Sequence, residues 1–174
     1  PLGRGGMGTV YRVTELASGR ALALKQLGGR AGSEPAARAR LRFKREFHIM
    51  AGLRHPHIVA VHEYGDDDAA GPYYTMELLD GADLRDAAPL DVEAACRVLR
   101  QLASALALLH SRRLIHRDLS PRNVRLDAGG SVRLIDFGVL STVGEAAELA
   151  GTPPLLAPES VRGLPLDHRV DLYA

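Results

Sequence analysis

The sequence contains no tryptophan and only one cysteine among its 174 residues. A single cysteine excludes both an internal disulfide framework and a cysteine-based metal cluster. Cys96 lies in a stretch rich in Ala, Val and Leu, so we expect it to be a small buried core residue. The sequence shows neither a signal peptide nor an apolar run long enough to span a bilayer. We therefore expect these residues to work in the cytoplasm, with any membrane anchor supplied from outside this sequence.

Lysine is also scarce, since Lys25 and Lys44 are the only two, whereas arginine is abundant. A lysine retained in such an arginine-rich composition indicates a position at which lysine itself is needed. The formal net charge of +1 does not indicate a nucleic-acid or anionic-membrane partner.

Residue periodicity divides the chain into a β-rich first part and a helical second part. In the first part, one helix with an apolar face is predicted to end near residue 53. The short strands around it are predicted at residues 10–13, 21–27, 58–64 and 73–78.

The character of the sequence changes after Gly81. Asp91 is a suitable N-cap for a long helix to about His110, followed by a hairpin over 124–135 and a helix from Asp167 onward. The sequence therefore predicts an α+β fold with a small β-rich lobe and hinge at 1–79 and an incomplete helical lobe at 80–174. The buried stripe of the long helix is predicted to contain Ala95, Val98, Leu99, Leu102, Ala105, Leu106 and Leu109.

A glycine-rich segment, Gly3 to Gly8, fits the pattern G-x-G-x-x-G and is followed by Val10. Glycines permit a tight turn and let backbone N–H groups approach phosphate oxygens. A dinucleotide-binding fold uses similar spacing but needs a helix directly after the glycines. Residues 9–13 are strand-like instead, which argues against that fold.

Lys25 and Ala23 alternate onto the same face of the strand at 21–27. A small side chain and an ammonium on one face would suit an adenine and its phosphates. Glu46, on the following helix, is a candidate ion-pair partner for Lys25. Taken singly, a surface lysine and a surface acid are the simpler interpretations of these two residues.

The segment His116 to Asn123 reads H-R-D-L-S-P-R-N, and the triplet D-F-G begins thirteen residues later at Asp136. The triplet A-P-E begins at Ala157. With the glycine-rich segment and Lys25, this set resembles the signature of the eukaryotic-like protein kinases and covers the whole chain. The Gly-Gly-Met-Gly of the first segment is most similar to bacterial serine/threonine kinases.

The resemblance implies a two-lobed kinase fold and roles for individual residues. Asp118 would accept or orient the proton of the substrate hydroxyl, and Asn123 and Asp136 would hold Mg²⁺ or Mn²⁺. Lys25 would contact the α- and β-phosphates of ATP and pair with Glu46. The other nucleotide-binding residues it implies are Leu2, Gly3, Gly5, Gly8, Val10, Ala23, the gatekeeper Met76, and the hinge from Glu77 to Leu79.

The same resemblance implies structural and regulatory positions. Thr152 matches the threonine of the substrate-binding loop of serine/threonine kinases, and tyrosine kinases usually carry a Trp-containing segment there. Arg117 marks the class often switched by phosphorylation of the activation loop, with Ser141 and Thr142 as candidate sites. A spine joining the two lobes would contain Met50, Val61, His116 and Phe137, anchored by Asp171.

Three positions depart from the family pattern. Ser120 stands where serine/threonine kinases normally carry a catalytic lysine that reaches the γ-phosphate. Arg125 occupies the adenine floor, where an apolar side chain is usual, so we expect weaker or altered ATP affinity. Leu155 replaces a common tyrosine, with no effect that the sequence explains.

The leading hypothesis is an ATP-dependent serine/threonine protein kinase acting on protein substrates. The main alternative is a pseudokinase, a nucleotide-binding scaffold, although Lys25, Asp118 and Asp136 are all retained. A small-molecule phosphotransferase is disfavoured by Thr152 and by the A-P-E triplet. In this family Glu159 pairs with an arginine much later in the chain. We therefore expect residues 1–174 alone to be poorly stable and to have little activity.

Overall fold

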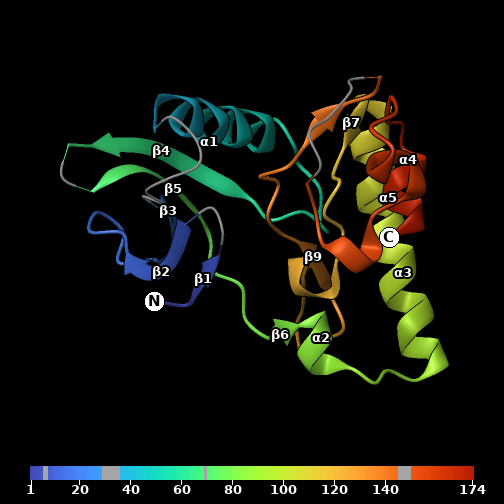
Figure 1. Cartoon of the computed structure of the whole chain (residues 1–174). Helices are drawn as coiled ribbons and strands as arrows, with labels where there is room; N and C mark the ends of the chain where they lie inside the picture. The colour runs from blue at the N-terminus through green and yellow to red at the C-terminus, as the bar shows by residue number, and fades with distance from the viewer. Residues whose placement is uncertain (6–7, 29–35, 69, 145–149) are drawn as a thin grey trace. The chain divides into compact units, whose positions relative to one another are not determined.

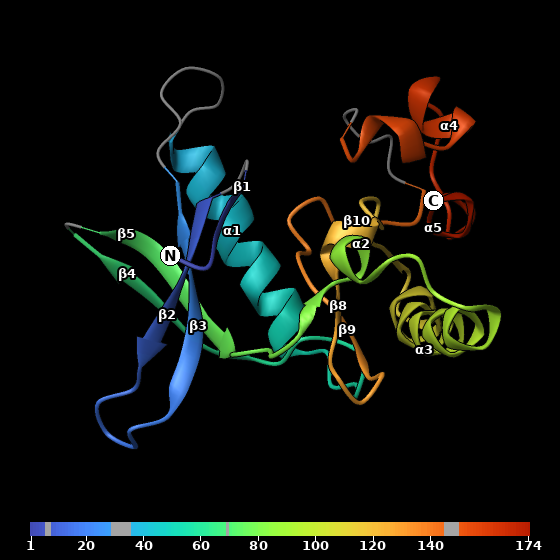
Figure 2. The ribbon, with the colours of Figure 1, turned by 90° about the horizontal axis from the view of Figure 1, so that it is seen from below.

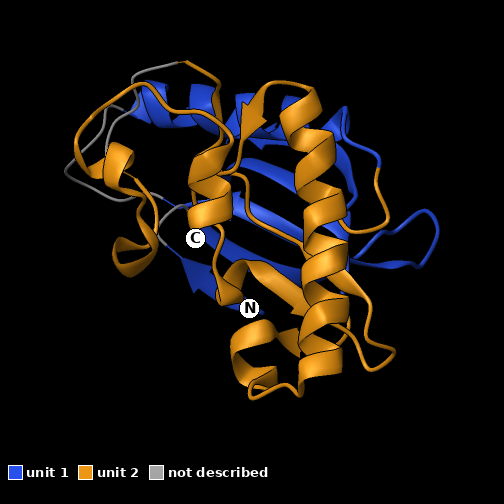
Figure 3. Cartoon of the chain, turned by 90° about the vertical axis from the view of Figure 1, so that its right-hand side faces the viewer, with its two compact units in different colours: residues 1–54, 59–79 blue, residues 55–58, 80–174 orange. Residues whose placement is uncertain are grey.

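The computed structural model describes residues 1–5, 8–28, 36–68, 70–144 and 150–174. These residues form an antiparallel sheet with one helix, followed by helices and short hairpins, which confirms the predicted α+β class (Figure 1). The chain divides into two compact units (Figure 3). Unit 1 contains residues 1–54 and 59–79, and unit 2 contains residues 55–58 and 80–174. Within the described ranges, no helix has the length and apolarity needed to cross a membrane.

The sheet of unit 1 has five strands in the order β1-β2-β3-β5-β4. Its register places Lys25 of β3 opposite Val10 on β2 and opposite Tyr74 on β5. Ala23 of β3 lies opposite Met76 of β5 in the same way. The strands are β1 Gly3–Gly5, β2 Gly8–Thr14, β3 Ala21–Leu27, β4 Val61–Asp67 and β5 Gly71–Glu77.

Helix α1, Ala36–Ala51, packs against β4 and β5 on one face of this sheet (Figure 2). Its buried residues follow the helical spacing i, i+3, i+4 and i+7, which places them on one stripe. The ring centroid of Phe43 lies 5.0 Å from that of Tyr74, and that of Phe47 lies 5.6 Å from that of Tyr64. The helix is therefore held to the sheet by aromatic packing. Its buried residues are Phe43, Glu46, Phe47 and Met50.

Two predictions for the first part need correction. The strand predicted over 58–64 begins three residues later, at Val61, because Ile58 instead forms a parallel bridge with Leu134 within unit 2. The glycine-rich segment is not one continuous turn, since β1 and β2 pair on either side of it. Gly6 and Met7 at its centre lie outside the described residues.

Unit 2 is built from short elements around the long helix α3. Strands β6, β8 and β9 form one small sheet, and β7 and β10 form another. A buried apolar cluster of Ile115, Ala157, Leu166 and Val170 joins segments distant in the sequence. The elements are β6 Ala82–Asp83, α2 Leu84–Ala87, α3 Val92–Ser111, β7 Leu114–Ile115, η1 Pro121–Asn123, β8 Val124–Leu126, β9 Val132–Leu134, β10 Ser141–Thr142, η2 Pro153–Leu155, α4 Pro158–Val161 and α5 Arg169–Tyr173.

Helix α3 begins where the sequence predicts, with the Asp91 side chain accepting a 2.7 Å hydrogen bond from the backbone N–H of Ala94. Two predicted core positions on this helix are wrong. Cys96 is exposed because, two positions before the buried Val98, it lies about 200° around the helix from it. Leu99 is 64% exposed, at the edge of the stripe. Ala95, also predicted in the stripe, is half-buried, and the stripe residues that are buried are Val98, Leu102, Ala105, Leu106 and Leu109.

Replacing the cap in Asp91→Ala removes an acceptor from the first turn of α3 and leaves a backbone N–H unsatisfied. We expect the free energy of unfolding to fall by about 1 kcal/mol. Chemical denaturation followed by circular dichroism measures this loss, with Asp91→Ser as the control that keeps a capping oxygen. Equal stability of the Ala and Ser variants would show that the cap contributes nothing.

Candidate active site

An ion pair between Lys25 and Glu46 lies in the interior of unit 1. The distance from Lys25 Nζ to Glu46 Oε1 is 2.9 Å, and the two side chains are only 8% and 4% exposed. The alternative interpretation of both residues as surface charges is therefore wrong. Removing one partner of a buried pair leaves an uncompensated charge, which costs several kcal/mol.

The candidate nucleotide-contacting residues of unit 1 lie on neighbouring strands. Val10, Lys25, Ala23 and Met76 are brought together by the register of β2, β3 and β5. Gly8 has a φ of 155°, and a Cβ there would lie 2.0 Å from the Gln26 carbonyl oxygen, so this position requires glycine.

The ends of the same region are held by backbone hydrogen bonds. The N–H of Leu2 donates to the Val10 carbonyl at 2.7 Å, and Gly3 and Gly5 pair with β2. In the segment predicted as the hinge, the Glu77 side chain accepts a 2.8 Å hydrogen bond from the Ala60 N–H. Leu79, at the end of unit 1, is half-buried.

In unit 2, the carboxylate of Asp118 receives a hydrogen bond on each oxygen. Asn123 Nδ2 donates to Asp118 Oδ2 at 3.0 Å and to the Asp118 carbonyl at 2.8 Å. Thr152 Oγ1 donates to Asp118 Oδ1 at 2.7 Å. A residue 34 positions later in the sequence thus helps to orient this carboxylate. Such an arrangement suits a group that must align a hydroxyl.

Asn123 and Asp136 are brought together by the hairpin of β8 and β9. The N–H of Ile135, directly before Asp136, donates to the Asn123 carbonyl at 2.8 Å. Asn123 Nδ2 donates to Asp118, so the amide oxygen of Asn123 is the atom that could ligate a metal ion. An amide oxygen and a carboxylate fit Mg²⁺, which is commonly held by one or two carboxylates together with substrate phosphates. Among the described residues, no group of three or more His, Cys, Asp or Glu side chains forms a metal cage.

Asp171 of α5 is buried and anchors the backbone that precedes Asp118. It accepts hydrogen bonds from the N–H groups of His116 at 2.9 Å and Arg117 at 2.8 Å, and it contacts His110 Nε2 at 2.9 Å. Arg117 has a φ of 68°, a left-handed conformation that is unfavourable for a residue with a side chain. The two backbone hydrogen bonds to Asp171 hold the chain in this conformation.

His116 is fully buried and packs edge-to-face against Phe137, with ring centroids 5.0 Å apart. Its Nδ1 accepts a 3.3 Å hydrogen bond from the Asp118 N–H, which assigns the proton of the neutral ring to Nε2. Burial lowers the pKa of His116 below its ordinary value of 6.5. Met50 and Val61 belong to unit 1, so a spine that joins them to these two rings remains a prediction.

The residues that depart from the family pattern have defined environments. Ser120 is buried at 7% exposure, directly before η1. Arg125 donates through Nη2 to the carbonyl of Gly81, a contact that the sequence did not predict. Leu155 lies in η2 and is half-buried, and nothing in the structure explains its effect.

The two candidate phosphorylation sites differ in accessibility. Ser141 is buried, and within the described part of the chain its Oγ has no hydrogen-bond partner. Thr142 is half-buried, and both lie on β10, which pairs with β7. Arg117 Nη1 is directed to the Val139 carbonyl at 3.4 Å. In this conformation Thr142 is the more accessible hydroxyl.

Sequence reasoning missed two contacts at the site. Tyr74 donates a hydrogen bond to Glu46, and His110 contacts Asp171. Strand alternation places Tyr74 on the same face as Met76, which is a signal that was available. The position of His110 at the end of a long helix carried no comparable signal.

Comparisons with known proteins bear on the whole chain. The family model described as "Protein kinase domain" matches residues 1–174. A probable serine/threonine-protein kinase of Streptomyces coelicolor is 36% identical over 99% of this chain. Serine/threonine-protein kinase PknB of Mycobacterium tuberculosis is also 36% identical over 99%, and kinase pkn2 of Myxococcus xanthus is 36% identical over the full chain. The chain spans 28%, 30% and 22% of the lengths of these relatives, respectively.

The burial of His116 predicts that the stability of the fold depends on pH. Its folded-state pKa is lowered, so below pH 6.5 the unfolded chain takes up a proton that the folded chain does not. Stability therefore falls as the pH drops from 6.5 towards the folded-state pKa, by up to about 1.4 kcal/mol per pH unit. The variant His116→Phe keeps an aromatic ring and should lose this part of the pH dependence.

Thermal melts of both proteins between pH 7.5 and 5.5 measure the difference. Burial also lowers the pKa of His55, but this residue is present in both proteins and its contribution cancels. Parallel curves of melting temperature against pH would contradict the assignment of a neutral buried His116.

Proposed function

The chain belongs to the protein kinase family, and on that premise we propose that it transfers the γ-phosphoryl group of ATP to serine or threonine hydroxyls of protein substrates. The observation that carries this proposal is the Asp118 carboxylate, oriented by Asn123 on one oxygen and by Thr152 on the other. With ATP as the donor, the domain would act in the cytoplasm.

Asp118 would align the attacking hydroxyl and take up its proton as the phosphorus–oxygen bond forms. The hydroxyl of Thr152, hydrogen-bonded to the same carboxylate, supports a protein substrate lying beside this loop. Phosphoryl transfer requires little covalent chemistry from the protein. Alignment of the substrate hydroxyl and neutralisation of the phosphate charge therefore supply most of the catalysis.

The remaining residues would manage the charge of the triphosphate. Asn123 and Asp136 would hold Mg²⁺, and bound Mg²⁺ supplies neutralisation of the phosphate oxygens. Lys25 would bind the α- and β-phosphates while Glu46 holds its ammonium in place. Ser120, in the usual position of a catalytic lysine, would contribute a hydrogen bond and no positive charge.

A pseudokinase is the alternative from another functional class. Both proposals share nucleotide binding by Lys25, and they differ in whether Asp118 acts on a hydroxyl. The oriented carboxylate favours catalysis, because a scaffold does not require Asp118 to be held by Thr152.

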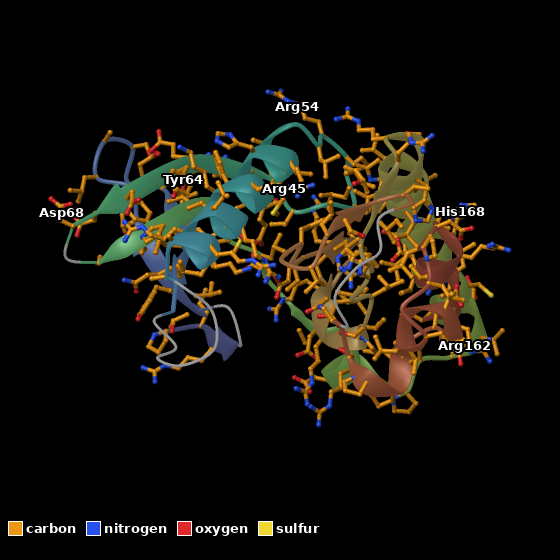
Figure 4. All side chains as sticks on the ribbon, turned by 45° about the horizontal axis from the view of Figure 1, so that its top comes forward. Arg45, Arg54, Tyr64, Asp68, Arg162 and His168 are labelled. Carbon is orange, nitrogen blue, oxygen red and sulfur yellow. The ribbon has the colours of Figure 1, made fainter. Side chains whose placement is uncertain are left out.

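Replacing the carboxylate in Asp118→Asn removes the proton acceptor but keeps the shape of the side chain. In the whole protein we expect transfer of radiolabelled phosphate from ATP to protein to fall by about a hundredfold or more. A matched control is Asp68→Asn, at the tip of the hairpin between β4 and β5 (Figure 4). Equal incorporation by wild type and Asp118→Asn would reject the assignment of Asp118.

Arg125 provides a separate prediction about nucleotide affinity. Its guanidinium is held by the Gly81 carbonyl, and as the residue at the adenine floor it would be partly desolvated beneath the ring face of the base. We expect Arg125→Leu to bind ATP about threefold to tenfold more tightly, which corresponds to about 1 kcal/mol of removed desolvation cost. Calorimetric titration with ATP and Mg²⁺ measures the dissociation constant. An unchanged constant would exclude a role for Arg125 in nucleotide affinity.

A further inference from the structure

Tyr74 of β5 is a buried tyrosine that touches the Lys25–Glu46 pair. Tyr74 is only 1% exposed, and its hydroxyl donates a 2.9 Å hydrogen bond to Glu46 Oε1. The same oxygen accepts the 2.9 Å hydrogen bond from Lys25 Nζ. A single carboxylate oxygen therefore receives one donor from β3 and one from β5.

The position of the hydroxyl is set by the sheet and by aromatic packing. Tyr74 and Lys25 are direct cross-strand neighbours, so their side chains emerge on the same face. The Tyr74 ring packs against Phe43 and Phe47 of α1, with centroid distances of 5.0 and 5.9 Å. Lys25 Nζ lies 5.8 Å from the centroid of the Tyr74 ring, within the range of a cation–π contact. The tyrosine is thus a fixed part of the structure that surrounds the ion pair.

The second donor changes what it costs to separate the pair. A buried carboxylate is stabilised by its counter-charge only when further hydrogen bonds satisfy its oxygens. If Glu46 turned away from Lys25, the buried Tyr74 hydroxyl would lose its carboxylate acceptor and keep the Met50 sulfur, a weak acceptor 4.0 Å away. The hydrogen bond from Tyr74 therefore opposes the movement that would release Lys25.

We propose that Tyr74 is a positioning residue, whose hydroxyl holds Glu46 and thereby keeps the Lys25 ammonium placed for its substrate phosphates. The hydroxyl comes from β5 of the same unit, so unit 1 supplies this restraint from its own residues. The part of the inference that concerns phosphates rests on the proposed kinase function, whereas the restraint on Lys25 does not.

The two lysines of the chain allow a test that does not depend on activity. An amine-acylating reagent modifies neutral, accessible amines, so the buried and paired Lys25 should react slowly and the exposed Lys44 quickly. In the whole protein carrying Tyr74→Phe, we expect the modification rate of Lys25 to rise about tenfold, with that of Lys44 unchanged. Mass spectrometry of the two peptides measures both rates.

The matched control is Tyr73→Phe, which removes a hydroxyl from the adjacent residue of β5. Tyr73 points to the opposite face of the strand, where its ring lies over Gly65. Its Lys25 modification rate should equal that of the wild type. An unchanged Lys25 rate in Tyr74→Phe, or an equal rise in Tyr73→Phe, would overturn the proposal.

A double-mutant comparison separates positioning from general loosening of unit 1. In a Glu46→Gln background no ion pair remains, so adding Tyr74→Phe should change the Lys25 rate by less than twofold. A tenfold rise in both backgrounds would mean that the substitution loosens or unfolds the unit, and it would contradict positioning through Glu46.

The kinetic readout distinguishes this proposal from the proposed function. Tyr74→Phe should raise KM for ATP and leave KM for the protein substrate unchanged, because Lys25 would meet the nucleotide only. If the wild type shows no phosphoryl transfer, the proposed function fails while the Lys25 rates still decide the role of Tyr74. If transfer is present but neither Lys25 modification nor KM for ATP responds to Tyr74→Phe, the role of Tyr74 fails and the function stands.

Discussion

Burying a carboxylate requires donors on its oxygens, and both units of this chain are arranged to meet that requirement. In unit 1, Glu46 receives the ammonium of Lys25 and the hydroxyl of Tyr74. In unit 2, Asp171 receives two consecutive backbone N–H groups and contacts His110. The hydrogen bonds to Asp171 hold the left-handed backbone at Arg117, and this conformation sets the path of the chain from β7 to Asp118. The buried Lys25 and the backbone that leads to the half-buried Asp118 are therefore each held by a carboxylate that is almost completely buried.

Much of the framework was predictable because it depends on local periodicity. The buried stripe of α1 and the N-cap of α3 at Asp91 follow from spacing and from one capping side chain. Strand alternation gave the face of Tyr74, but its contact with Glu46 also depends on the register of β3 and β5. The contact of His110 with Asp171 depends on tertiary packing, which no local pattern encodes. Cys96 and Leu99 were predicted to be buried because an Ala- and Leu-rich helix offers several overlapping apolar stripes, and the structure buries only one of them.

In the candidate site, as in the framework, sequence motifs identify residues, whereas the contacts between those residues depend on the fold. The kinase motifs identified Asp118, Asn123 and Asp136, and the structure adds the hydrogen bonds that orient them. The hydrogen bond from Thr152 to Asp118 joins two motifs that are distant in the sequence, so only the folded structure reveals it. Ser120 and Arg125 depart from the family pattern next to these residues, one removing a positive charge and the other adding one. The roles of all these residues remain proposals, while membership of the protein kinase family rests on the match over the whole chain.

We propose that Asp118 and its neighbours direct transfer of the γ-phosphoryl group of ATP to a hydroxyl of a protein. The most direct measurement is identification, by mass spectrometry, of the amino acids phosphorylated when the whole protein is incubated with ATP, Mg²⁺ and a general protein substrate. We expect phosphoserine and phosphothreonine that accumulate with time and with enzyme concentration. Binding of ATP with no phosphorylated protein would contradict it and identify a nucleotide-binding scaffold instead.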